Sequence, residues 1–251
     1  MQVKTTNIRA DRTILAITDF SKSSTNAILF AAHLLKDSNL KLKLVNIVEN
    51  PTDKTPLLIS VEDILAKDSE DGLKKQSAEI ASAFKNDTLH ISTYSLSGKL
   101  KKIVPAISPA DTIDLIVAGI PSDKHSGKNL HNVPLLFMGQ SRHPTLIVPE
   151  NFTPKPIKSV LILNMSSEPP GKTFDFGFEH IFSQHQPARH IIQINAAKTG
   201  PGALASIENT ISDEKKDLAI LIPSAGDRID KALLEYRIQD LSPFVTSILN
   251  S

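Results

Sequence analysis

The sequence predicts an α/β protein in which buried parallel strands alternate with helices. Short apolar runs rich in Ile, Leu and Val recur along the chain, and polar segments with helical apolar spacing separate them. The order of the runs then repeats after a proline-rich break. Since crossovers between parallel strands are right-handed, we expect Rossmann-like sheets covered by helices, in two domains at 1–152 and 153–251.

The first strand is expected at 13–19, where the apolar run TILAITD is bounded by charge. Apolar residues at i, i+3, i+4 and i+7 from Ile28 indicate an amphipathic helix after it, with Asp19 or a serine placed to cap its start. Further strands are expected at 41–49, 89–96, 114–120 and 143–150. Further helices are expected at 61–84, where Gly72 could break the helix, at 99–107, ended by Pro105 and Pro109, and at 133–140. The first domain should therefore have five strands.

A shorter copy follows the linker at 151–158. Its strands are expected at 159–165, 189–195, 217–223 and 243–250. The first strands of the two copies lie about 146 residues apart (13 to 159), but the Asp-Leu strands only about 103 (114 to 217). The second copy has thus lost roughly 40 residues, about one helix and one strand, which leaves about four strands.

Composition narrows the class of protein. Of 251 residues, 40% are hydrophobic and 22% charged, which is typical of a soluble globular protein. The net charge of +1 argues against binding driven by nucleic-acid phosphates. Without Cys there are no disulfides or thiolate metal sites, and no apolar run approaches the roughly 18 residues of a membrane span. We expect a cytoplasmic protein with no metal site and with neither a nucleic acid nor a membrane as partner.

The first copy resembles the universal stress protein family. The residues that carry the resemblance are 14–49, the run DLIVAGI at 114–120 and HPTLIVPE at 143–150. The likeness covers residues 10–150, and more faintly 157–251. It implies a tandem member whose two domains pair through their last strands about a pseudo-twofold axis. It also implies roles in stress survival, dormancy and signalling rather than a defined reaction.

The strand ends suggest where a ligand would bind. In open parallel sheets ligands lie beyond the carboxyl ends of the strands, where the strand order reverses. Asp19 ends the first strand, Ile47 lies near the end of the second and Gly119 near the end of the fourth. In ATP-binding relatives, the resemblance implies, the aspartate meets the nucleoside and the residue matching Ile47 lies by the adenine. A loop of the pattern Gly-x-x-Gly-x9-Gly-Ser/Thr then takes the phosphates through its backbone amides.

The loop after Gly119 departs from that pattern. Ser122 stands where the second glycine should be, and Pro121 contributes no N–H. The closing pair, Gly139 and Gln140, lies about 16 residues after Ser122 instead of ten, and Gln replaces the hydroxyl. A changed loop length displaces hydrogen-bond donors that need near-ideal geometry.

Two interpretations of this region stay open. In the first, ATP or another adenine nucleotide binds the first domain, and Gly127 occupies a middle turn of the phosphate loop. The candidate ligand-binding residues are then Asp19, Ile47, Gly119, Gly127, Gly139 and Gln140. In the second, the loop is degenerate and Asp19 only caps its helix, which leaves a scaffold without ligand that docks to an unidentified protein. A homodimer of tandem chains is compatible with both.

The second copy offers weaker candidates. Asn164 stands in the place of the aspartate, so we expect this copy to complete the intramolecular pseudo-dimer rather than bind nucleotide. Gly171, Lys172 and Thr173 match the end of a Walker A loop, but the prolines before them remove amides that should hold phosphate. ATP hydrolysis is therefore the weakest alternative, and the sequence predicts a regulatory protein without defined catalysis.

Overall fold

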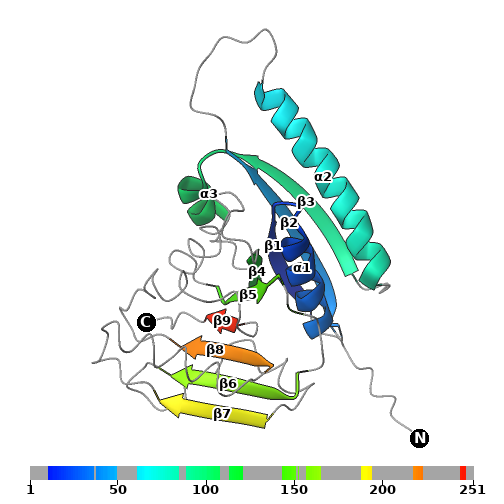
Figure 1. Ribbon diagram of the computed structural model, residues 1–251. Coiled ribbons are helices and arrows are strands. Elements are labelled where there is room, and N and C mark those ends of the chain that lie inside the picture. Colours follow the sequence, from blue (N-terminus) through cyan, green and yellow to red (C-terminus); the bar gives the residue numbers. More distant parts are fainter. Residues whose placement is uncertain are drawn as a thin grey trace, which may run out of the picture.

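The computed structural model describes residues 11–36, 38–49, 61–84, 89–107, 113–120, 143–150, 152, 157–164, 188–193, 217–222 and 244–246. Its elements are β1 (Asp11–Thr18), α1 (Lys22–Leu34), β2 (Asn39–Val48), α2 (Val61–Phe84), β3 (Leu89–Ser97), α3 (Leu100–Ile107), β4 (Leu115–Ile120), β5 (Thr145–Pro149), β6 (Ser159–Asn164), β7 (Ala188–Gln193), β8 (Leu218–Ile222) and β9 (Phe244–Thr246) (Figure 1). The helix expected at 133–140 lies outside the described residues.

The described strands form one sheet in the order β3-β2-β1-β4-β5-β9-β8-β6-β7. The strands β1 to β5 are mutually parallel, which confirms the expected five-stranded parallel sheet. β9 pairs with β5 in the antiparallel direction, and Leu146 lies opposite Val245. β8, β6 and β7 continue the sheet, each parallel to its neighbours and to β9. The strand order reverses between β1 and β4, so the edge beyond Thr18 is where a ligand of this fold would bind.

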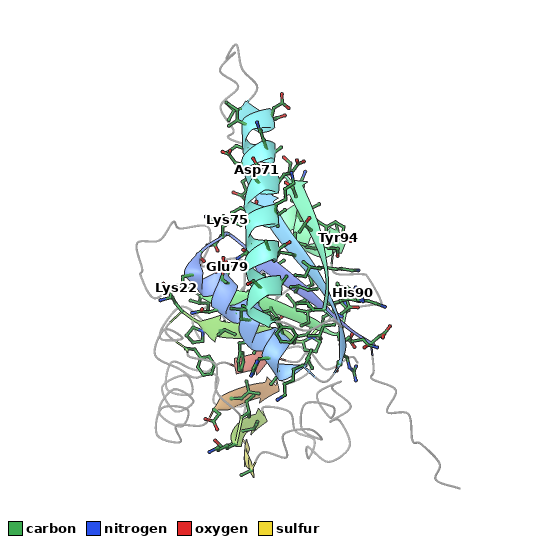
Figure 2. The ribbon with its side chains drawn as sticks, turned by 90° about the vertical axis from the view of Figure 1, so that its right-hand side faces the viewer. Lys22, Asp71, Lys75, Glu79, His90 and Tyr94 are labelled. Atoms are coloured by element: carbon green, nitrogen blue, oxygen red, sulfur yellow. The ribbon has the colours of Figure 1, made fainter. Side chains whose placement is uncertain are left out.

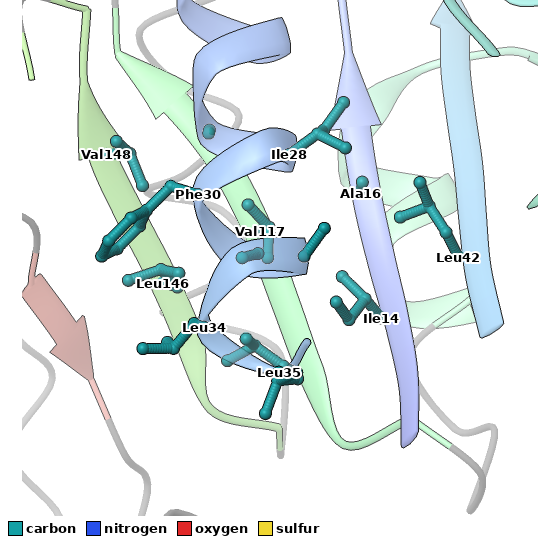
Figure 3. Packing of buried hydrophobic residues seen from close by; sticks show 14 of the residues in the cluster. Ile14, Ala16, Ile28, Phe30, Leu34, Leu35, Leu42, Val117, Leu146 and Val148 are labelled. Atoms are coloured by element: carbon teal, nitrogen blue, oxygen red, sulfur yellow. The ribbon is translucent and has the colours of Figure 1, made fainter. Parts of the chain in front are cut away.

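The helices cover both faces of the sheet. α1 packs on the face that Ile14 and Ala16 of β1 share with Val117 of β4, as Figure 3 shows. The opposite face holds a smaller cluster that includes Leu15, and the end of α3 packs against it through Ile107. Because both faces are covered, β1, β4 and β5 form nearly continuous apolar runs, which is why their sequences predict parallel strands well.

The helices at 61–84 and 99–107 lie where they were expected, but Gly72 and Pro105 do not act as expected. α2 is continuous from Val61 to Phe84, so Gly72 does not break it. A Cβ built on Gly72 would come within 2.7 Å of the ring of Phe20, which explains the glycine by a close contact instead. α3 runs through Pro105 to Ile107, so Pro105 does not end it. Pro105 lacks a backbone N–H, which removes one hydrogen bond near the end of a short helix. The first turn stays intact, because the N–H groups of Lys102 and Ile103 donate to the carbonyl of Lys99.

An aspartate precedes both β4 and β8, and each binds the start of a neighbouring strand. The Oδ2 atom of Asp114, before β4, accepts a hydrogen bond from the backbone N–H of Thr13 at 2.7 Å. The Oδ2 atom of Asp217, before β8, accepts one from the backbone N–H of Ser159 at 3.0 Å. Both contacts satisfy amide groups at the amino-terminal ends of strands, so each aspartate fixes the start of a strand pair. Among the helices that the structure describes, none is both long and apolar enough to cross a membrane.

Candidate functional site

Asp19 lies in the turn between β1 and α1. Its Oδ1 atom accepts hydrogen bonds from the backbone N–H of Ser21 at 3.0 Å and from the Ser21 hydroxyl at 2.6 Å. Ser21 is the N-cap of α1, and its Oγ atom accepts a hydrogen bond from the backbone N–H of Ser24. A serine therefore caps the helix, and Asp19 orients that serine. The Oδ2 atom of Asp19 makes no hydrogen bond to any described residue, and the side chain is only half-buried.

Buried hydroxyl groups hold this turn in place. The Ser23 hydroxyl lies 2.8 Å from that of Ser21, and because the Ser21 proton points to Asp19, Ser23 is the donor. The Ser24 hydroxyl donates to the backbone carbonyl of Ser21, and its oxygen lies 3.0 Å from the hydroxyl of Thr18. Thr18 also accepts the backbone N–H of Phe20, whose φ of 64° places it in the left-handed region. These contacts compensate for the strained backbone and fix the position of Asp19 at the sheet edge.

Gly119 lies at the end of β4, against the first turn of α1. A Cβ on this residue would come within 2.3 Å of the Ser23 carbonyl oxygen and within 2.7 Å of the Ser24 nitrogen. Those atoms belong to the backbone and cannot turn aside. The glycine is thus required for α1 to begin this close to the sheet, whether or not a ligand also approaches it.

The structure brings three of the sequence-predicted residues to one edge. Thr18 pairs with Asn46 across β1 and β2, so Asp19 and Ile47 each lie one residue beyond that pair. Ala16 pairs with Val117, which places Gly119 level with Thr18. Ile47 is half-buried and packs on the face opposite α1. The other three candidates, Gly127, Gly139 and Gln140, lie outside the described residues.

Sequence reasoning missed a buried polar chain behind this edge. The Asn46 Nδ2 atom donates to the carbonyl oxygen of Thr18 at 2.7 Å, and its Oδ1 atom accepts the hydroxyl of Ser69 at 2.8 Å. The Ser95 hydroxyl in turn donates to the Ser69 oxygen at 2.7 Å. The chain joins β1, β2, α2 and β3, and both Asn46 and Ser69 are buried. A signal was present in the sequence, because Ser69 occupies the buried stripe of α2 with Leu73 and Ile80.

The chemistry available at this edge is hydrogen bonding. Asp19 offers a carboxylate acceptor, and Lys22 in the first turn of α1 is exposed and offers an ammonium donor. On the far side of α1, the Asn26 amide donates to the carbonyl of Glu150, which ties the helix to the end of β5. Across the described ranges, no three His, Asp or Glu side chains form a group that could hold a metal ion.

Comparisons with known proteins agree with this architecture. The model of the universal stress protein family matches residues 11–149, more than half of the chain. A universal stress protein from Archaeoglobus fulgidus has a similar structure, with a TM-score of 0.63 and 13% identity over 96% of this chain and 97% of that chain. A functionally unknown protein from Pseudomonas aeruginosa PAO1 gives a TM-score of 0.56, with 11% identity over 95% of this chain and 92% of that one.

A putative universal stress protein from Pseudomonas aeruginosa UCBPP-PA14 gives a TM-score of 0.51, with 10% identity over 94% of this chain and 93% of that one. At such identities these structures show the fold alone. No curated protein matches the sequence. The family model extends from the start of β1 to the end of β5 and takes in Asp19, Ile47 and Gly119. The chain therefore belongs to the universal stress protein family.

Proposed function

We propose that this protein is a cytoplasmic regulator of the stress response that binds an adenine nucleotide, with ATP as the first candidate, at the carboxyl edge of β1, β2 and β4. One observation carries the proposal. The turn after β1 holds Asp19 with Oδ1 bound to Ser21, while Oδ2 has no partner among the described residues. That oxygen can accept a hydrogen bond from a ribose hydroxyl or an adenine amino group, and Ile47 lies one strand away to pack on the base.

The proposal does not include catalysis. The Asp19 carboxylate can accept hydrogen bonds from a nucleotide, but it is not an activated nucleophile. The hydroxyls of Thr18 and Ser24 are hydrogen-bonded within the turn, and no general base among the described residues activates them. Backbone amides near Gly119, Gly127, Gly139 and Gln140 would donate hydrogen bonds to the phosphates. Because the loop is longer than the family pattern, phosphate binding is the step of the proposal that the experiment tests most directly. Without those amides the protein acts as a scaffold that docks to another protein.

We further propose that 153–251 is a shortened second copy of 1–152. Ile14 pairs with Leu115 and Val160 pairs with Leu218, so the two pairs are separated by 146 residues (14 to 160) and 103 residues (115 to 218). These offsets equal those between the repeated sequence runs. The aspartates before β4 and β8 bind the strand starts at the same offsets.

The pairing of the last strands supports a pseudo-twofold arrangement of the two copies. Around the central pair of Leu146 and Val245, Thr145 lies opposite Thr246 and Ile147 lies opposite Phe244. If β9 corresponds to β5, a twofold rotation that exchanges the two strands leaves this set of residue pairs unchanged. The second copy then covers the edge of β5 that would otherwise be open.

Calorimetric titration of the full chain with ATP and magnesium tests nucleotide binding. Asp19→Asn is the informative variant, because its amide oxygen still accepts from Ser21 while the second position becomes a donor. We expect a Kd of about micromolar size, weakened at least about tenfold in Asp19→Asn. Asp11→Asn is the matched control, since Asp11 lies at the opposite end of the same strand.

Three results would count against the proposal. Equal affinity of the native chain and Asp19→Asn would remove Asp19 from the site. An absence of both heat and thermal shift would show that the altered loop no longer supports binding, and would favour the scaffold. Phosphate release under the same conditions would contradict the absence of catalysis, and Lys172→Ala would then test the Walker-like segment.

A further inference from the structure

The edge strand β3 has no neighbouring strand on one side among the described residues. It lies at the end of the sheet order and pairs with β2 through nine consecutive residue pairs, from Leu40 with Leu89 to Val48 with Ser97, without a bulge. Figure 2 shows β3 beside α2, with His90 and Tyr94 along it. Thr93 is exposed, and Tyr94 retains 44% of its accessible surface. In the part of the chain that the structure describes, no strand adjoins its outer side.

This edge lacks the features that usually prevent strand pairing. Natural edge strands are short, carry Lys or Pro, or are interrupted by bulges. The nine residues of β3, LHISTYSLS, contain no Lys, Arg, Asp, Glu or Pro, and the strand exceeds the common length of about five or six residues. β7, at the other edge, has six residues and contains Arg189. The two edges therefore differ, and β3 is better suited than β7 to accept another strand.

The backbone direction shows which groups are available. The N–H of Gly98 donates to the carbonyl of Val48 at 2.9 Å, so the residue after β3 bonds toward β2. Alternate residues of a parallel pair face the partner strand. Ile91, Thr93 and Ser95 therefore direct their backbone N–H and C=O groups toward the open side.

We propose that β3 pairs antiparallel with β3 of a second copy of this chain, about a twofold axis at Thr93. In this register Thr93 lies opposite its own copy and Ile91 opposite Ser95, so the outward-facing groups of both strands meet in hydrogen-bonded pairs. On the face away from α2, Tyr94 lies opposite Ser92, and the two Tyr94 rings become diagonal neighbours within reach of each other. Because the strand has no acidic or Lys/Arg side chains, no such like charges are opposed.

The helix above the edge leaves room for this pairing. α2 packs on both β2 and β3, so two copies of α2 would approach across the axis. At about 100° per residue, Ala66, Ser77 and Ala81 lie on the flank of α2 opposite the one where Gly72 contacts Phe20. That flank also carries the exposed carboxylate of Glu70, so the small side chains limit steric conflict while the two helices stay far enough apart to keep their carboxylates solvated. β5 is already paired with β9, so a second copy finds its open strand at β3.

Light scattering on the full chain and two variants of Thr93 tests the interface. Thr93→Pro removes an N–H that faces the open side and leaves the hydrogen bonds to β2 in place, whereas Thr93→Val keeps that N–H. We expect a molar mass of twice 27.4 kDa for the native chain and for Thr93→Val. Thr93→Pro should have the single-chain mass, should still unfold cooperatively, and should lose the concentration dependence of the melting temperature that a dimer has.

Single cysteines report the register, because the chain contains no Cys. In a hydrogen-bonded antiparallel pair the two Cα atoms at position 93 lie about 5.5 Å apart, within the range that a disulfide spans. The two copies of position 90 would be six residues apart along the strand, roughly 20 Å. Under mild oxidation Thr93→Cys should form covalent dimers, and His90→Cys, which is also at an exposed position, should not.

Several results would overturn the proposal. A native chain that stays monomeric as its concentration rises excludes the dimer. A dimer that persists in Thr93→Pro, without a disulfide in Thr93→Cys, places the interface elsewhere. Masses that grow beyond two copies indicate head-to-tail pairing of β3 with β7. If Thr93→Pro does not fold, the comparison of the two cysteine variants decides. Nucleotide binding plays no part in this interface, so either proposal can fail alone.

Discussion

Gly119 and Ser23 touch through their backbones, and no side chain separates the end of β4 from the first turn of α1. Gly119→Ala forces α1 away from the sheet, because a Cβ would lie 2.3 Å from the Ser23 carbonyl oxygen. We expect the free energy of unfolding to fall by about 1–3 kcal/mol, as for overpacked cores. Denaturant titration measures it, and a neutral result would contradict the rigid contact between α1 and β4.

Gly72→Ala should behave differently, although its Cβ would also be crowded. The atoms that it would meet are the far ring atoms of Phe20, at 2.7 Å, and Phe20 is 38% exposed and able to move. Alanine favours a helix by up to about 1 kcal/mol over glycine, which offsets the lost contact. We expect a change in unfolding free energy of less than about 1 kcal/mol. Loss of nuclear Overhauser contacts between the Phe20 ring and α2 would report the displaced ring, and a ring left in place would contradict this prediction.

Asn46→Ala should be among the more destabilising polar changes. It leaves the Thr18 carbonyl without its side-chain donor and the Ser69 hydroxyl without its acceptor, both in buried surroundings. Orphaned buried groups cost about 1–3 kcal/mol each. Thermal unfolding measures the loss, and Ser92→Ala, at an exposed site on β3, is the control. Equal melting temperatures for the two variants would show that the polar chain adds no stability.

Asp114→Ala and Asp217→Ala should both lower the melting temperature. Each removes a carboxylate that accepts a backbone N–H at the start of a neighbouring strand. Hydrogen bonds to a charged group contribute about 1.5–3 kcal/mol. Calorimetry of the full chain compares the two variants. A loss of stability in Asp114→Ala alone would argue against the proposal that 153–251 repeats 1–152.

The pKa of Asp11 should lie below its ordinary value of 3.8, because Lys41 and then Asn39 donate hydrogen bonds to its carboxylate. A lowered pKa in the folded state favours folding above pH 3.8, and this contribution disappears as the pH falls through the folded pKa. Carboxyl NMR titration measures the value. Lys41→Met should move the pKa upward, and an unchanged value would contradict the assigned cause.

The strands were predictable from sequence because burial on both faces leaves a continuous apolar run, as at 13–19 for β1. The placement of Asp19 and Gly119 at one edge followed from the strand ends. The contact between Asn46 and Ser69 did not, because it depends on how α2 docks on β2 at a sequence separation of 23. The role of a glycine could not be predicted from the sequence alone. A helix break, a close packing contact and a phosphate site all favour a residue without a side chain, so the sequence does not distinguish them.

The antiparallel junction of β5 and β9 gives the sheet two opposed polarities. The carboxyl ends of β1 and β4 point one way, and the carboxyl ends of β6 and β8 point the other way. A strand of five residues spans about 17 Å, so a molecule held at Asp19 lies at least that far from the edge of Asn164. No single small ligand can bridge those two edges, so any signal between them would have to travel through the protein itself.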